Sequence, residues 1–179
     1  TFVAGSSWQP DEDLFIEYFN QHPEVKLVIA PHVIDENHLV EIIRKLKRPY
    51  VRYTRADEKN VRKADCLIID CFGLLSSIYR YGEIAYIGGG FGVGIHNTLE
   101  AAVYGIPVIF GPKYQKFQEA IQLLEAKGAF SVKDYEELKT LLDRMLTDEV
   151  FLRESGMNAS NYVTGNAGAT DKIMSMINF

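Results

Sequence analysis

The sequence IAYIGGGFGVGIHNTLEAAVYGIPVIFGP, residues 84–112, decides how the rest of the chain is interpreted. It opens with an apolar run, places five glycines within seven residues, and continues into residues 96–104, which have the composition of a helix. Gly105 and Pro107 separate that helix from a second apolar run. The order strand, glycine loop, helix, strand is typical of a parallel α/β sheet, where such a loop lies at the carboxyl ends of the strands and can bind ligands.

The glycine loop has two interpretations. Without Cβ atoms it can bend sharply and bring N–H groups close to a bound ligand, or it can simply be a turn where helix and strand pack closely. The stretch contains neither GxGxxG nor GxxxxGK[ST], so neither an ordinary dinucleotide site nor a P-loop is supported. Asn97 and Glu100 share one helix face, and the carboxylate is suited to accept hydrogen bonds from ribose hydroxyls. Asn97 or Thr98 is expected to cap this helix.

Apolar runs alternate with amphipathic segments along the whole chain, which predicts about six βα units. We therefore expect an α/β fold, with a Rossmann-like parallel sheet of about six strands and helices on both faces. The charged segment 54–63 is expected to be a loop. The expected strands are 1–4, 26–30, 50–53, 65–70, 84–87, 108–110 and 129–132, and the expected helices are 10–22, 35–46, 74–81, 96–104, 114–127, 134–146, 148–163 and 168–178.

Composition and charge limit the possible partners. A chain of 179 residues fits one domain, and a net charge of −5 argues against nucleic acid as a partner. Basic residues cluster in 44–48 and 52–62, which is either a solvated helix end and loop or a basic rim near an anionic donor or a membrane. The chain begins at Thr1 inside an apolar run, so we expect a fragment of a longer protein. No metal site is expected, because Asp, His and Cys do not cluster.

The run GGGFGVGIHNTLEAAVYGIPVIFGPKYQKFQEA resembles the donor-site signature of the 3-deoxy-D-manno-octulosonic acid (Kdo) transferases, which have the GT-B glycosyltransferase fold. Further segments match that family in the same order. The family favours GHNxLE, and here residues 94–100 carry this motif with one residue inserted. The matching segments are GSSWQPDE near the start, APH at 30–32, DCFGL at 70–74 and NAGA at 166–169.

The resemblance implies that residues 1–179 are the single donor-binding domain, the C-terminal half of a GT-B fold, from a longer two-domain enzyme. The family transfers Kdo from CMP-Kdo, with inversion, to a lipid A precursor at the cytoplasmic face of the bacterial inner membrane, in lipopolysaccharide biosynthesis. By resemblance, the catalytic base, the lipid acceptor and the membrane contact belong to the missing N-terminal domain. This fragment then holds no catalytic residue and needs no cofactor, since CMP-Kdo is its substrate.

Two alternatives stay open beside this interpretation. One is another GT-B enzyme that uses a UDP-sugar, either a glycosyltransferase or an epimerase. The other is a GT-B-like module that has kept the fold without a donor site. Three departures from the family pattern make it conceivable: His32 stands where the family has Pro-Arg-His, Leu74 replaces an acidic residue, and Lys116 replaces an asparagine.

The candidate donor-binding residues follow the strand ends, because ligands of such sheets bind there. The serines after the first strand either face the donor phosphate or make a turn. Phe72 either packs against cytosine or belongs to the core. Lys116 either reaches the sugar carboxylate or faces solvent. The full set is Ser6, Ser7, Pro31, His32, Phe72, Gly73, Leu74, Gly89, Gly90, Gly94, His96, Asn97, Glu100 and Lys116.

Overall fold

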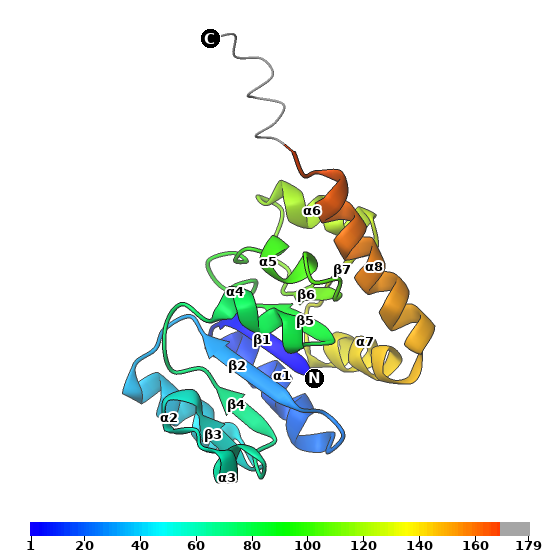
Figure 1. Ribbon diagram of the computed structural model, residues 1–179. Coiled ribbons are helices and arrows are strands. Elements are labelled where there is room, and N and C mark those ends of the chain that lie inside the picture. The colour runs from blue at the N-terminus through cyan, green and yellow to red at the C-terminus, as the bar shows by residue number, and fades with distance from the viewer. Residues whose placement is uncertain (169–179) are drawn as a thin grey trace.

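The structure, a computed structural model, describes residues 1–168 as a parallel sheet with helices on both faces (Figure 1). The sheet has seven strands in the order β3-β4-β2-β1-β5-β6-β7, and every neighbouring pair is parallel. The predicted fold class is confirmed. The sheet was expected to have about six strands, and each of the seven predicted strand segments overlaps one of the seven observed strands. The strands are β1 Phe2–Ser7, β2 Leu27–Pro31, β3 Tyr50–Arg52, β4 Cys66–Ile68, β5 Ile84–Ile87, β6 Val108–Phe110 and β7 Ala129–Ser131.

The helices follow the strands in alternation, as the amphipathic segments predict. Two short 3-10 turns, Tyr53–Arg55 and Tyr79–Tyr81, complete the described elements. The predicted helix 168–178 lies outside the described residues except for its first position. The helices are α1 Gln9–Gln21, α2 Glu36–Lys45, α3 Glu58–Val61, α4 Leu75–Ile78, α5 Leu99–Ala102, α6 Gln118–Glu125, α7 Tyr135–Thr147 and α8 Glu149–Gly165.

Alternation along the central strand divides the core between the two faces of the sheet. Phe2 and Ala4 of β1 face one cluster, in which the ring of Phe2 packs edge-on against Phe15 of α1 at 6.0 Å. Val3 faces the opposite cluster, which contains Tyr79 and the small buried side chains of α5. Because both faces are covered, the strands are nearly continuous apolar runs, as expected for a parallel sheet.

The position of the ligand crevice follows from the strand order. From β1 the chain moves to β2 on one side of the sheet, and later to β5 on the other side. The order therefore reverses between β1 and β5, and parallel sheets bind ligands beyond the carboxyl ends of the strands at such a reversal. The loops after β1 and β5 flank this point.

Several predicted boundaries were wrong, each for a local reason. The segment 54–63 is not simply a loop, because Asp57 caps α3 by accepting hydrogen bonds from the backbone of Lys59 and Asn60, and the Asn60 side chain accepts in return from the Asp57 backbone N–H. In the expected helix 74–81, the Ser77 hydroxyl donates to the Leu74 carbonyl at 2.9 Å, and the segment divides into α4 and a 3-10 turn.

Two helices near the glycine loop are shorter than expected. In 96–104 only α5 is regular, because the backbone N–H of His96 bonds to the carbonyl of Gly88 and the Asn97 side chain accepts from Leu99 N. In 114–127 the helix begins at Gln118, after Phe117, whose backbone is extended. The Phe117 ring packs close to Gly94, where an added Cβ atom would lie 3.1 Å from it.

Candidate functional site

The end of β1 separates the two predicted serines. β1 continues to Ser7, past the predicted end at Ala4, and its pairing with β2 shifts between Gly5 and Ser7. Ser6 sits at this shift with φ 52° and is half-buried. Ser7 is fully buried, and its hydroxyl donates to Glu12 Oε1 at 2.9 Å. The Ser7 side chain therefore anchors the first turn of α1 through Glu12, whereas Ser6 is the serine at the surface of the crevice.

Asp11, in the first turn of α1, is a buried carboxylate that sequence reasoning missed. It accepts hydrogen bonds from the backbone N–H groups of Trp8 and Gly89 and from the hydroxyl of Tyr86, each at 2.9 Å. Burial raises the pKa of Asp11, although these three hydrogen bonds oppose the rise. The carboxylate ties α1 to the glycine loop and thereby fixes the two loops that flank the crevice.

Glu12, the next residue of α1, is equally buried and was also missed. It accepts hydrogen bonds from Ser7 and, at 3.0 Å, from Nε2 of His38 in α2. Nδ1 of His38 lies 2.8 Å from the carbonyl oxygen of Val33, so both ring nitrogens face oxygen atoms, an arrangement that favours the doubly protonated ring. Burial alone would lower the pKa of His38, but the hydrogen bond and charge of Glu12 raise it overall.

Several of the glycines after β5 are required by the packing of the loop. Gly89 has φ +95°, and an added Cβ atom there would lie 2.2 Å from the carbonyl oxygen of Gly94. At Gly90 an added Cβ would lie 2.6 Å from the backbone of Gly111, after β6. The N–H groups of Gly92 and Gly94 both donate to the carbonyl of Gly89. Close packing of the backbone thus accounts for Gly89 and Gly90, whether or not a ligand binds beside the loop.

Three aromatic rings meet above the strand reversal. His32, after β2, stacks on Trp8 with ring centroids 4.7 Å apart and on His96 with centroids 4.4 Å apart. Trp8 Nε1 donates to His96 Nε2 at 3.3 Å, so that nitrogen carries no proton. Burial, with the nearby His32, lowers the pKa of His96. The predicted residues His32 and His96 are therefore brought together, with Trp8 as an unpredicted third ring.

A pocket of 230 Å³ opens beside this stack, at the ends of β1, β2 and β4. Phe72 is 81% exposed and so does not belong to the core. Leu74 is half-buried at the start of α4, which has only four residues. The pocket brings together five of the predicted residues, namely Ser6, Pro31, His32, Phe72 and Gly73.

The remaining candidates lie on the other side of the reversal. Asn97 Nδ2 donates to Glu100 Oε1 at 3.2 Å, which confirms that the amide and the carboxylate share one face. Of the two possible caps, Asn97 makes the hydrogen bond, whereas the Thr98 hydroxyl is buried without a partner among the described residues. Lys116 is exposed, and the unpredicted Lys113 donates to the Gly92 carbonyl at 3.0 Å.

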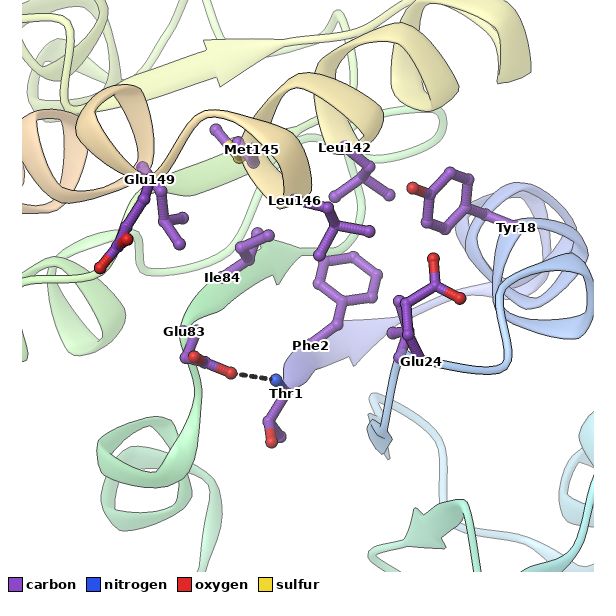
Figure 2. Close-up of a pocket in the computed structure, with 12 residues that line it drawn as sticks. Thr1, Phe2, Tyr18, Glu24, Glu83, Ile84, Leu142, Met145, Leu146 and Glu149 are labelled. Atoms are coloured by element: carbon purple, nitrogen blue, oxygen red, sulfur yellow. Dashed lines mark hydrogen bonds and ion pairs between the residues drawn. The ribbon is translucent and has the colours of Figure 1, made fainter.

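A different kind of pocket lies at the amino end of the sheet, away from all the predicted residues. It has a volume of 320 Å³, and Figure 2 shows Phe2, Leu142 and Leu146 directed toward it. Glu24 and Glu83 stand at its border. Its apolar lining comes from β1, β5, α7 and α8, so it is a gap between packed elements.

Two kinds of feature are absent from residues 1–168. Their His, Cys, Asp and Glu side chains form no group of three or more able to hold a metal ion. Across the same residues, no helix is both long and apolar enough to cross a bilayer.

Comparisons with known proteins point to one family. No protein-family model matches the chain. The chain is 34% identical over 151 residues to the 3-deoxy-D-manno-octulosonic acid transferase of Aquifex aeolicus, which covers 81% of the chain and 41% of the relative. It is 29% identical over 173 residues to a bifunctional glycosyltransferase/methyltransferase of Fusobacterium nucleatum, covering 90% of the chain and 27% of the relative. The chain thus spans less than half the length of these relatives.

Among solved structures, the chain is similar to the C-terminal CMP-Kdo binding domain of WaaA from Acinetobacter baumannii. The TM-score is 0.77 at 18% identity, and the alignment covers 90% of the chain and 88% of that domain. This likeness establishes the fold, and the sequence similarity establishes the relationship. The chain belongs to the 3-deoxy-D-manno-octulosonic acid transferase family and has the fold of the C-terminal domain of a GT-B glycosyltransferase.

Proposed function

We propose that the chain is the donor-binding domain of a Kdo transferase and binds CMP-Kdo at the carboxyl end of its sheet. The observation that carries this proposal is the convergence of predicted residues on the strand reversal, in a chain related by sequence to Kdo transferases. The loops after β1, β2, β4 and β5 all contribute to that convergence. Parallel α/β sheets bind nucleotides at this position.

The ribose, the base and the phosphate of the donor each have a suitable partner. The Glu100 carboxylate, held by Asn97, is suited to accept hydrogen bonds from the ribose hydroxyls. The exposed ring of Phe72 offers an apolar surface for cytosine, and the pocket beside Ser6 and Gly73 offers room for the phosphate. Hydrogen bonds and the N–H groups at nearby helix starts would stabilise the leaving CMP electrostatically, since such groups are already oriented before the donor binds.

The rest of the enzyme is part of the same proposal. The Kdo transfer would invert the anomeric centre, use a base from a separate N-terminal domain, and act on a lipid A precursor in lipopolysaccharide biosynthesis. The site of action would be the cytoplasmic face of the bacterial inner membrane. The family relationship supports this larger picture. The chain itself covers 41% of the Aquifex relative, so these roles are inferred from the family.

Thermal unfolding in the presence of nucleotides tests the proposal. A ligand that binds only the native state raises the unfolding midpoint, so CMP should raise it while UDP does not. Glu100→Ala should remove the CMP shift, whereas Glu24→Ala, which removes an exposed carboxylate at the amino end, should retain it. A wild-type chain that CMP leaves unchanged would contradict the proposal.

A second candidate is a glycosyltransferase with another nucleotide-sugar donor. The Fusobacterium relative favours this candidate, because its name gives only the broader activity of a glycosyltransferase. Its alignment covers 90% of this chain. A shift with UDP in place of CMP would support this candidate. A chain that responds to no nucleotide would instead support a module without a donor site.

A further inference from the structure

We propose that the edge of the sheet formed by residues 44–63 docks on an anionic lipid surface. This basic edge comprises the end of α2, the edge strand β3 and α3, which lie together at one end of the molecule (Figure 1). It contains nine of the 19 Lys and Arg residues but two of the 24 Asp and Glu residues. The inference does not depend on which nucleotide the domain binds.

The basic side chains of this edge divide into two groups. Three hold the fold together, because Lys45 pairs with Asp13 at 2.7 Å while Arg48 and Arg52 pair with carboxylates of the β4 region. The other six are exposed and form no ion pair with any of residues 1–168. These six are Arg44, Lys47, Arg55, Lys59, Arg62 and Lys63.

Hydrogen bonds hold the two halves of the basic edge next to each other. The backbone N–H of Asp65, just after Lys63, donates to the carbonyl of Pro49 at 2.8 Å. The Asn60 side chain donates to the Arg55 carbonyl at 2.9 Å. The segments that carry the six charges are therefore neighbours in space as well as in sequence.

Apolar surface accompanies the charge. Tyr50, Tyr53 and Val61 are each between 43% and 48% exposed. Beside them runs a groove of 360 Å³, where short α3 covers the sheet incompletely. Its lining residues are Lys26, Leu27, Val28, Val51, Tyr53, Ala56, Val61, Ala64, Asp65, Cys66 and Leu67.

This combination fits a membrane interface. Lys and Arg clusters are attracted to anionic headgroups, and tyrosine rings favour the boundary between headgroups and acyl chains. RNA also attracts basic residues, but an apolar groove makes no favourable contact with a phosphate backbone. The charge, the tyrosines and the groove together favour the lipid surface.

Co-sedimentation with vesicles tests the inference. The chain should sediment with phosphatidylcholine vesicles that contain phosphatidylglycerol, should remain in solution with phosphatidylcholine alone, and should be released by salt. Arg62→Glu/Lys63→Glu should weaken binding by at least about tenfold. Lys127→Glu/Arg153→Glu is the matched control, because it changes the net charge equally at exposed sites outside the basic edge and should weaken binding less than about twofold.

Unfolding midpoints of both variants show whether each is folded, and Tyr50→Ser, which changes no charge, should also weaken binding. An equal loss of vesicle binding in the two double variants would overturn the proposal, since the net charge of the chain would then explain the binding. Equal binding to neutral vesicles, or preferential binding of single-stranded RNA over anionic vesicles, would overturn it as well.

Discussion

The two ends of the sheet differ in whether their carboxylates are buried or exposed. At the carboxyl end, Asp11 and Glu12 are completely buried, and each accepts two or more hydrogen bonds. At the amino end, Glu24 and Glu83 are exposed beside an apolar pocket. Burying a carboxylate is costly unless hydrogen bonds compensate it. The chain therefore buries hydrogen-bonded carboxylates where the loops of the proposed donor site meet, and packs apolar side chains at the amino end.

The largest expected effect is that of Asp11→Ala. This change leaves the N–H of Gly89 and the hydroxyl of Tyr86 without their acceptor, so the free energy of unfolding should fall by about 3 kcal/mol. Glu24→Ala at the amino end should change it by less than about 0.5 kcal/mol. Urea unfolding measures both, and similar losses would abolish the distinction between the two ends.

Gly90→Ala should have the next largest effect. Its Cβ atom would lie 2.6 Å from the Gly111 backbone, so the two loops must separate at a cost of about 1–3 kcal/mol. Gly92→Ala is the control within the same loop, because its nearest neighbour would be 3.9 Å away. If the two variants unfold at the same urea concentration, the close contact of these loops is not needed for stability.

The pair between His38 and Glu12 should make stability depend on pH. Because the pKa of His38 is raised in the folded state, its contribution is fully present below the unfolded pKa of about 6.5 and is lost as the pH rises through the folded value. His38→Gln should therefore destabilise the chain more at acidic pH than at alkaline pH. Urea midpoints of wild type and variant across this range measure the difference, and a constant difference would refute a raised pKa of His38.

Phe72→Ser should have the smallest effect on stability and a clear effect on ligand binding. The side chain is 81% exposed, so its removal should change the free energy of unfolding by less than about 0.5 kcal/mol. If Phe72 packs against the base, the CMP-induced rise of the midpoint should shrink. An unchanged shift would remove Phe72 from the site.

Patterns of apolar residues were sufficient to predict the fold, because buried parallel strands are nearly continuous apolar runs. The same patterns also located the glycine loop and the pairing of Asn97 with Glu100. They could not reveal the roles of Asp11 and Glu12, because acidic residues at a helix start are usually exposed and favour the helix dipole. Their burial depends on Tyr86 and His38, which lie far away in the sequence.

A local cap and a contact between distant loops explain the remaining errors. The cap formed by Asp57 and Asn60 turned an expected loop into α3, and its signal is a short D-x-x-N spacing within a charged segment. The ring stack of Trp8, His32 and His96 joins three separate loops, and no periodicity within one segment predicts such a contact.

The most direct test of a donor site at the carboxyl end is a titration of the ¹⁵N-labelled chain with CMP, followed by amide chemical shifts. We predict perturbations at Ser6, His32, Gly73 and Glu100, which surround the strand reversal. Perturbations confined to Leu142 and its neighbours in the amino-end pocket, or none at all, would contradict the account.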